Sequence, residues 1–190
     1  MLRVLTGGLL SLALLLAPTV QAHQDDPRLG PLFERLQSTG DPGEAGAIQA
    51  SIWRIWLESD DEKVNQLMKV GRRAMAIGDF DEADVAFTEM IKRAPDFAEG
   101  WNKRATLYYL MGLSGRLRYF EASIRDVERT LALEPRHFGA LSGMGLIHTA
   151  LEDEALALEW FERALGVNPH MPYIKERVRR LKEKIEGKPI

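Results

Sequence analysis

The sequence predicts an all-α protein, built as a solenoid of about four helix–turn–helix pairs followed by one capping helix. Two observations indicate this fold class. Apolar residues recur at three- and four-residue steps through most of the chain after residue 28, which is the spacing of one face of an α-helix. Helix-breaking and helix-starting residues also recur at a fixed spacing. Pro135 and Pro169 are 34 positions apart, and so are Asp61 and Pro95. A fixed period of this length is typical of stacked helical hairpins, in which each pair buries its apolar face against its neighbours.

Length, composition and charge fit an ordinary globular domain. The chain has 190 residues, of which 45% are hydrophobic and 28% are charged. Its net charge of −3 gives no general attraction to nucleic acid, so we expect no nucleic-acid partner. There is no cysteine, which excludes disulfides, thiolate metal sites and a lipid-modified cysteine. The sequence contains no phosphate-binding glycine loop, serine elbow or zinc motif, and we expect no cofactor and no metal.

Residues 1–22 have the features of a secretory signal peptide. A positive charge at Arg3 precedes the apolar run Leu9–Leu16, and the segment ends in the small-x-small pattern Val20-Gln21-Ala22. The apolar run is shorter than the roughly 18–20 residues that a membrane-spanning helix needs. We therefore expect cleavage after Ala22, a periplasmic mature protein and no stable membrane insertion afterwards; a retained anchor is the alternative. Residues 23–28 would then be a flexible polar leader.

Residues 29–60 are predicted to form a degenerate first helix pair. Asp41 is followed by Pro42 and by Glu44, which is the pattern of an acceptor cap at the start of a helix. The apolar positions around this cap repeat at helical spacing: Leu32, Phe33, Leu36, Ile48, Ile52, Ile55 and Trp56. The pair lacks the small residues of the later pairs, as terminal repeats often do.

Three further units follow, at residues 61–97, 98–137 and 138–171. Asp61 and Asp79 are acceptor caps that begin the two helices of the first of these units. After the third unit, residues 172–190 hold an amphipathic helix and a short tail. Its many cations are interspersed with glutamates, so we favour a solvated cap of the stack over a membrane or nucleic-acid surface.

The middle unit departs from the period, since Pro95 and Pro135 are 40 residues apart. We assign the excess to a six-residue insertion in the turn, at residues 113–118. Insertions in repeat proteins map to loops on one edge, which is often a binding edge. A tolerated surface loop is the alternative, because lengthening a loop costs little free energy.

The three units resemble tetratricopeptide repeats in both spacing and residue type. The residues that carry this resemblance on the last two units are Trp101, Ala105, Tyr108, Leu141, Gly145, Ala157, Phe161, Ala164 and Pro169. Gly145 and Ala157 are small where two antiparallel helices must approach closely, and Pro169 cannot continue a helix. The resemblance implies a right-handed superhelical solenoid. It also implies that the first helix of each pair lines a concave surface that holds a partner's peptide.

Carried over position by position, the resemblance places a partner-binding groove on the first helices. The groove residues would be Asn65, Lys69, Arg72, Asn102, Lys103, Thr106, Tyr109 and Arg177, flanked by Glu99, Ser142, Leu146, Thr149, Tyr173 and Arg180. This face is more basic than the chain as a whole. A segment bearing carboxylates, or a free carboxyl terminus, is therefore the favoured guest, and ordinary solvated positions are the alternative. Relatives that clamp the carboxyl termini of heat-shock chaperones use a Lys/Asn/Arg set on three successive first helices. This chain does not reproduce that set, because its last helix pair presents Gly139, Ser142 and Gly143 there.

Few residues could support catalysis. His148 and Glu152 are four positions apart and could share a helix face. Two groups are weak evidence for a metal site, and a packed, hydrogen-bonded histidine is the simpler interpretation. His137 and His170 each follow shortly after a repeat-closing proline, and we expect both to lie in solvent.

Arg104 occupies a repeat position that is normally apolar. A buried charge must be paired, so we expect a carboxylate partner, either Asp84 or Asp126.

The sequence therefore predicts a non-catalytic protein–protein interaction scaffold or adaptor that binds an exported partner protein or peptide. Two alternatives stay open. One is an accessory subunit of an envelope-assembly or cytochrome-maturation complex. The other is a small hydrolase or metal-binding enzyme, for which His148 and Glu152 would be the only starting point.

Overall fold

The computed structural model describes residues 26–187, and all of the regular structure in this part of the chain is α-helical. The expected signal peptide 1–22 and the first residues of the leader lie outside the described residues. In chain order the helices are α1 Leu29–Ser38, α2 Pro42–Leu57, α3 Glu62–Ile77, α4 Phe80–Arg93, α5 Ala98–Leu113, α6 Arg118–Leu133, α7 Phe138–Ala150, α8 Glu154–Val167 and α9 Pro172–Ile185. No helix within residues 26–187 combines the length and the apolar composition that crossing a membrane requires.

Aspartate side chains begin four of the helices. Those of Asp41, Asp61, Asp79 and Asp153 each accept a hydrogen bond of 2.8–3.1 Å from a backbone N–H in the first turn of α2, α3, α4 and α8. Such caps satisfy N–H groups that have no partner inside the helix. The caps at Asp41, Asp61 and Asp79, predicted from the sequence, are thereby confirmed.

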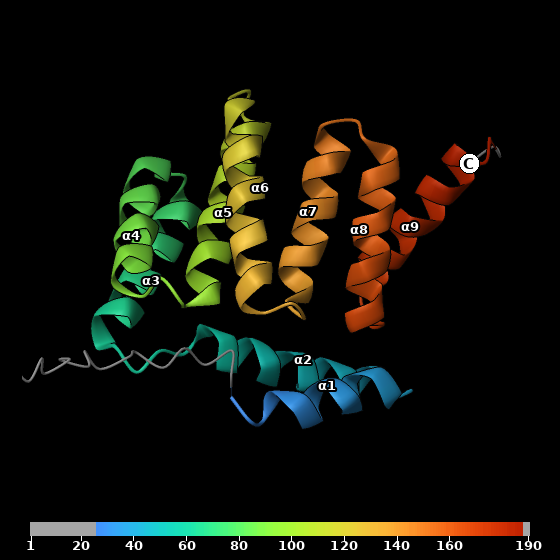
Figure 1. Ribbon diagram of the computed structural model, residues 1–190, viewed down its shortest axis with the longest axis horizontal. Coiled ribbons are helices and arrows are strands. Elements are labelled where there is room, and N and C mark those ends of the chain that lie inside the picture. The colour runs from blue at the N-terminus through green and yellow to red at the C-terminus, as the bar shows by residue number, and fades with distance from the viewer. Residues whose placement is uncertain (1–25, 188–190) are drawn as a thin grey trace, which may run out of the picture.

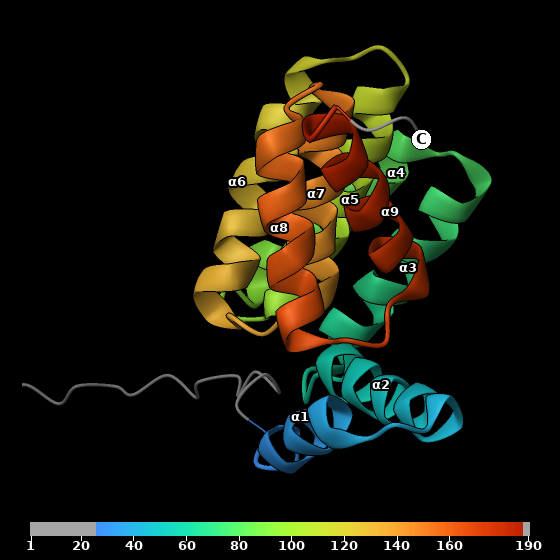
Figure 2. The same ribbon diagram turned by 90° about the vertical axis from the view of Figure 1, so that its right-hand side faces the viewer.

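Helices α3 to α9 pack in sequence order as a stack of hairpins, with α9 against α8 at the end (Figure 1). The first helices of the pairs, α3, α5 and α7, lie on one side together with α9, and the second helices α4, α6 and α8 lie on the other. Viewed from the end of the stack, α3 and α9 project to the same side beyond α5 and α7 (Figure 2). The face of the first helices is therefore concave, as expected for a helical solenoid.

In each hairpin of the stack, a glycine on the first helix meets a phenylalanine ring on the second. The pairs are Gly71 with Phe87, Gly112 with Phe120 and Gly145 with Phe161, and a Cβ on any of these glycines would lie 2.4–2.6 Å from the ring. Since real Cβ atoms do not approach so closely, the glycines set the distance between the two helices. Most of the signature residues are buried, namely Ala105, Leu141, Gly145, Ala157, Phe161 and Ala164, whereas Trp101, Tyr108 and Pro169 are half-buried.

The extra residues of the middle unit are not confined to a loop. Helix α5 has 16 residues against 13 in α7, α6 has 16 against 14 in α8, and only residues 114–117 separate α5 from α6. The insertion assigned to residues 113–118 is thus mostly absorbed by longer helices. A strongly apolar helix face can continue through added residues, because each added turn keeps its backbone hydrogen bonds.

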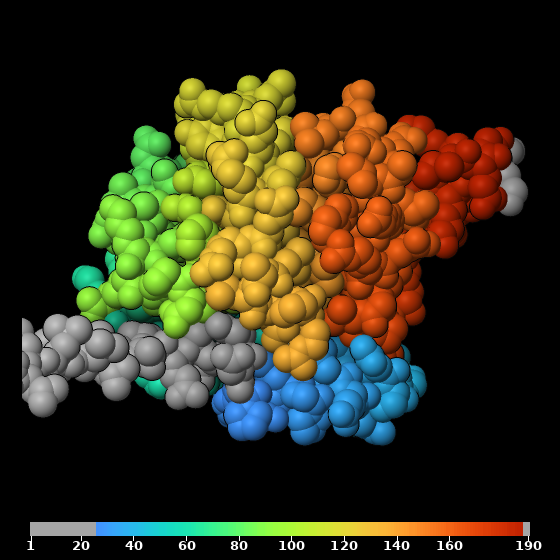
Figure 3. Space-filling view, viewed as in Figure 1, coloured from blue at the N-terminus to red at the C-terminus, as the bar shows by residue number. Residues whose placement is uncertain are grey.

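The hairpin α1–α2 forms where the first helix pair was expected, but it does not extend the stack in line. It runs across the lower ends of the other helices (Figure 1), and in the space-filling view the blue hairpin lies directly beneath the yellow and orange helices (Figure 3). Its core of Leu29, Phe33, Leu36, Ile52 and Trp56 also includes Phe138 from the start of α7. Unlike the stacked hairpins, this one has no glycine at which an added Cβ would meet a phenylalanine ring of the partner helix.

Candidate functional site

A pocket of about 130 Å³ lies on the concave surface between α5, α6 and α7. It is lined by Asn102, Ala105, Thr106, Tyr109, Ser123, Val127, Gly139, Ser142, Gly143, Leu146 and Ile147. Three of the groove residues predicted from the sequence, Asn102, Thr106 and Tyr109, thus come together with Ser142 and Leu146 of the next first helix. Most of this lining is apolar or small, so the pocket suits an uncharged side chain.

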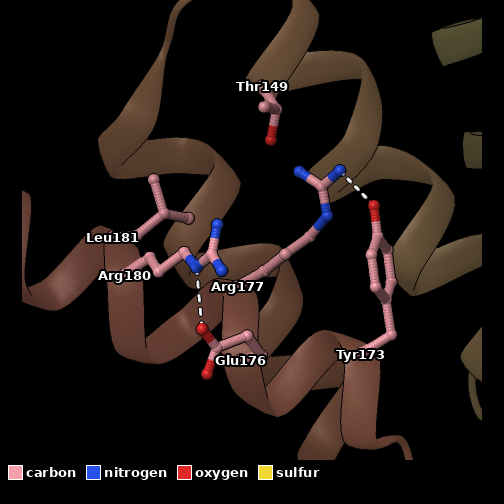
Figure 4. Close-up of a pocket in the computed structure, with 6 residues that line it drawn as sticks. All are labelled: Thr149, Tyr173, Glu176, Arg177, Arg180 and Leu181. Atoms are coloured by element: carbon pink, nitrogen blue, oxygen red, sulfur yellow. Dashed lines mark hydrogen bonds and ion pairs between the residues drawn. The ribbon is translucent and has the colours of Figure 1, made fainter. Parts of the chain in front are cut away.

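A second pocket, of about 370 Å³, lies between α7 and α9 and is lined by Thr149, Tyr173, Glu176, Arg177, Arg180 and Leu181 (Figure 4). The Arg177 guanidinium donates a hydrogen bond to the Tyr173 hydroxyl, and its centre lies 4.7 Å from the Tyr173 ring. Arg180 Nε donates to Glu176 Oε1 at 2.7 Å. Glu176 and Leu181 are the two lining residues that repeat positions alone did not suggest.

Tyr109 connects the two pockets electrostatically. It lines the pocket between α5 and α7, and burial raises the pKa of its hydroxyl. Arg177 lowers this pKa and Tyr173 raises it. The two pockets share α7, which contributes Leu146 to the first and Thr149 to the second. The concave surface therefore offers an apolar pocket beside a basic one.

Two predicted groove donors, Asn102 and Lys103, are instead committed to a buried carboxylate. The Asn102 amide donates to Glu99 Oε2 at 2.8 Å, and Lys103 Nζ lies 2.6 Å from Glu99 Oε1. The ammonium of Lys103 also lies over the Trp53 ring of α2, 5.4 Å from its centroid. Glu99 itself, placed in the groove by sequence, is fully enclosed at 1% exposure. At this end of the groove, neither donor is free to bind a guest.

The pKa of Glu99 is about 2, well below its ordinary value. Burial raises this pKa and is the largest single effect, but the combined pull of Lys103 and of the hydrogen bond from His137 outweighs it. The buried carboxylate is therefore ionised at neutral pH and is held by three partners.

His137 was expected in solvent, and this expectation is wrong. Its ring is fully buried and stacks on Trp56 of α2, with centroids 4.1 Å apart and planes 10° from parallel. Its Nδ1 accepts a hydrogen bond from the Ala140 N–H at 3.0 Å, so the proton resides on Nε2, which lies 2.9 Å from Glu99 Oε2. The histidine thus caps α7 and joins the hairpin to α5.

His170 and His148 also differ from expectation. His170 is half-buried at the turn before α9, and its Nε2 is enclosed, so it is not a solvated residue. His148 is half-buried as expected, but its Nδ1 has no hydrogen-bond partner within residues 26–187. In the same part of the chain, no three His, Asp or Glu side chains gather in a way that could hold a metal ion.

The remaining predicted groove residues lie on α3. Lys69 and Arg72 are exposed and form no ion pair with another described residue, while the Asn65 amide donates to the Ser59 carbonyl at 2.7 Å. None of the three lines the two pockets described above. The structure thus brings together the groove residues of α5, α7 and α9 and leaves those of α3 apart.

Arg104 has the carboxylate partner that the sequence required. Its Nε and Nη2 donate to the two Asp126 oxygens at 2.8 and 2.9 Å, and its Nη1 donates to the Thr88 hydroxyl. The other candidate, Asp84, accepts a hydrogen bond from Tyr108 instead. Because these side chains lie between α4, α5 and α6, they hold adjacent repeats together and do not face the groove.

These features define an α-helical repeat protein made of stacked hairpins with a concave inner face. A family model for the tetratricopeptide repeat matches residues 115–172. A TPR repeat-containing protein of Rhizobium etli is 37% identical over 160 residues, which cover 84% of this chain and 76% of that protein. The chain belongs to the tetratricopeptide repeat family.

Solved structures show the same fold. The first TPR of Spaghetti (RPAP3), bound to the HSP90 peptide SRMEEVD, superposes with a TM-score of 0.59 and 24% identity. That match covers 67% of this chain and 96% of that one. The TPR2B domain of yeast Sti1, in complex with an Hsp70 peptide, superposes with a TM-score of 0.56 and 25% identity, over 65% of this chain and 99% of that one.

Proposed function

We propose that this protein is a non-catalytic interaction module that binds a segment of a partner protein on the concave surface of α5, α7 and α9. One observation carries the proposal: three successive first-type helices contribute Tyr109, Leu146 and Arg177 to adjoining pockets of apolar and basic character. Support comes from two solved structures with the same fold: the first TPR of RPAP3 is bound to an HSP90 peptide, and the TPR2B domain of Sti1 is in complex with an Hsp70 peptide. Folds of this family generally serve as interaction modules.

A peptide fits this surface better than a small substrate does. The pocket between α5 and α7 offers the hydroxyl groups of Thr106 and Ser142 next to apolar walls, which suits one side chain of an extended segment. The basic pocket lies one helix further along the same face. An extended chain crossing α5, α7 and α9 could occupy both at once.

Affinity selection from a synthetic peptide library tests the proposal. We expect peptides that bind the wild-type protein to lose about tenfold or more in affinity when Thr106→Arg fills the mouth of the α5–α7 pocket. Ala132→Arg adds the same charge at an exposed position of the second helix α6 and should leave binding unchanged. The proposal would be overturned if the library yields no binder, or if the selected peptides bind Thr106→Arg with the same affinity as the wild type.

We further propose that the partner is an exported protein. The support is the segment 1–22, with Arg3 before the run Leu9–Leu16 and a small-x-small end at Ala22. Expression in a bacterial host followed by mass spectrometry of the periplasmic fraction tests this. A mature chain beginning at His23 is expected, and a chain that stays cytoplasmic and begins at Met1 would contradict it.

A further inference from the structure

The end of the stack formed by α3 and α4 has no capping helix. Each of α5, α7 and α9 packs against the second helix that precedes it, namely α4, α6 and α8. Within residues 26–187, no helix packs along α3 in this way, because α2 runs across the lower ends of the stacked helices (Figure 1). A helical solenoid closes its ends with polar helices, as α9 does at the other end. The outer face of α3 and α4 is therefore left without a neighbouring helix.

Val70 on α3 shows what this face lacks. The equivalent repeat positions on α5 and α7, 34 and 74 residues further along the chain, are Arg104 and Met144. Met144 is 1% exposed and packs with Val127 of α6. Arg104 reaches back to the Thr88 hydroxyl of α4. Val70 is 42% exposed, so the position that meets a preceding second helix in the other two repeats meets none on α3.

Apolar side chains run along this face, and a pocket lies at its lower end. Lys63, Leu67, Val70 and Ile77 follow one another at steps of three, four and seven residues, so they share one side of α3. Ile77, in the last turn of α3, is 72% exposed. The pocket between α3 and α4 has a volume of about 470 Å³ and is lined by Lys63, Leu67, Glu89, Lys92 and Arg93. The face thus has a projecting apolar side chain at its upper end and a hollow at its lower end.

These two features fit each other when a second copy is turned by a two-fold rotation. Val70 lies seven residues from Lys63 and seven from Ile77, which is about 10.5 Å in each direction at the rise of an α-helix. If two copies face each other with their α3 helices antiparallel and the axis at Val70, Ile77 of each copy comes opposite the pocket of the other. In such an isologous contact every favourable interaction is made twice.

The charges of α4 agree with the same arrangement. Asp81 and Glu82 lie in the first turn of α4, and Lys92 lies in its last turn. Antiparallel pairing places the acidic turn of one copy opposite the basic turn of the other. The ion pair of Lys92 with Glu89 is exposed on both sides and contributes little, so Lys92 can bind a carboxylate of a second copy. A helix of another protein would need matching charges of both signs, whereas a second copy carries them already.

We propose that two copies of this chain associate through the outer face of α3 and α4, around a two-fold axis at Val70. Ile77 of each copy fills the pocket between α3 and α4 of the other, and Asp81 pairs with Lys92 across the interface. The two pockets between α5, α7 and α9 do not line this face. Association of two copies therefore does not depend on peptide binding, and either can be absent without the other.

Sedimentation equilibrium over a concentration series tests the association. We expect a monomer–dimer equilibrium with a dissociation constant on the order of 10 µM, because the contact is small and partly polar. Ile77→Asp and Val70→Asp should each weaken the dimer by about tenfold or more, since both put a carboxylate into the contact and the second brings two of them together at the axis. Leu117→Asp, at a site 68% exposed between α5 and α6, is the matched control and should change nothing. Circular dichroism verifies that each variant is folded.

A charge reversal tests the antiparallel arrangement. Asp81→Lys and Lys92→Glu should each weaken the dimer by roughly three- to tenfold, because each places like charges opposite one another in both halves of the interface. The double variant Asp81→Lys/Lys92→Glu should restore most of the affinity, since both members of each pair come from the same sequence.

Three outcomes would overturn the proposal. A protein that stays monomeric up to about 200 µM does not pair through this face, which would then be open to a helix of another protein. A dimer that Ile77→Asp and Val70→Asp leave intact, or that Leu117→Asp disrupts, is formed by a different face. If the double charge reversal is as weak as its single variants, the two-fold arrangement at Val70 is wrong.

Discussion

A single missing side chain sets the spacing between α7 and α8. The Cβ that alanine would carry at position 145 lies 2.5 Å from the Phe161 ring, which is fully buried. In the same helix, Gly143 has no atom of another side chain or of distant backbone within 4 Å of such a Cβ. The two glycines therefore lie in the same helix, but position 143 has room for a Cβ and position 145 does not.

We expect Gly145→Ala to lower the free energy of unfolding by about 1–3 kcal/mol, because the ring or the helix must move to relieve the overlap. Gly143→Ala, the matched control, should raise it by roughly 0.5–1 kcal/mol, since alanine loses less conformational freedom than glycine in a helix. Urea unfolding followed by circular dichroism measures both. Equal effects of the two substitutions would show that the contact with Phe161 does not set the spacing.

The ion pair of Arg104 with Asp126 gives a second prediction at this scale. The side chains are 16% and 6% exposed. Burial lowers the pKa of Arg104 and is the largest single effect, but Asp126, Tyr108 and Asp84 together raise the pKa above its ordinary value. We expect Asp126→Asn to cost about 3–5 kcal/mol of stability, because it leaves a largely buried guanidinium unpaired. Replacing both partners, as in Arg104→Met with Asp126→Leu, should recover most of that loss. If the double variant is as unstable as Asp126→Asn alone, the loss in Asp126→Asn does not come from leaving Arg104 unpaired.

Single residues also show what could be read from the sequence. The partner of Arg104 was predictable, because a charge at an apolar repeat position requires a carboxylate on the neighbouring helices. The burial of Lys103 was not predictable. Glu99 and Lys103 are four positions apart on α5, the spacing of an ordinary surface pair, and only α2 and His137 enclose them. No local pattern in the sequence indicates that α2, α5 and the segment around His137 lie next to one another.

Among the elements, the α1–α2 hairpin is the one whose position the periodicity could not fix. The caps and apolar spacing of α1 and α2 predicted both helices. Their place beneath the stack depends on aromatic contacts of Trp53 and Trp56 with His137 and Phe138, 80 or more residues away in the chain. Whether a segment forms a helix is thus indicated by its local sequence. Where that helix packs depends on contacts with residues far away in the chain.

Gly139→Ala tests how the hairpin is docked. Its Cβ would lie 2.6 Å from the tip of the Trp53 ring and 3.2 Å from the His137 ring, so the tryptophan must shift. We expect faster amide hydrogen exchange in α2, by about tenfold, with little change in α5, α6 and α8. Gly143→Ala serves again as the control within α7. Faster exchange spread over the whole stack would show that the hairpin and the repeats open as one unit.

For the whole molecule, the hairpin adds contacts that a simple stack lacks. In a solenoid each repeat contacts its neighbours only, so stability is close to a sum of local terms. Here Trp53 of α2 contacts Lys103 of α5 and Phe138 of α7, and the Asn168 side-chain amide, in the connection between α8 and α9, donates a hydrogen bond to Gln49 Oε1 at 3.1 Å. Ties to α5, to α7 and to the connection between α8 and α9 make the unfolding of these repeats more cooperative. The buried Glu99 lies where the hairpin, α5 and α7 meet.

The pH dependence of stability should reveal this junction. The pKa of Glu99 falls from 4.5 in the unfolded chain to about 2 in the folded protein, so the ionised carboxylate favours folding. The sign follows from linkage: its contribution is fully present above pH 4.5 and is lost as the pH falls toward 2, because the unfolded chain takes up the proton first. Lys103, His137 and Asn102 face the carboxylate and hold it ionised.

We therefore expect the difference in unfolding free energy between the wild type and Glu99→Gln to be large and constant from pH 7 to about 5, and to shrink steadily between pH 4.5 and 2. Glu128→Gln, at an exposed position of α6, should run parallel to the wild type throughout. Urea unfolding at fixed pH values, monitored by circular dichroism, measures both. A difference that stays constant down to pH 2 would mean that folding leaves the pKa of Glu99 unchanged, so that its ionisation does not favour folding. In that case the hairpin would be held by its aromatic contacts without help from the buried charge.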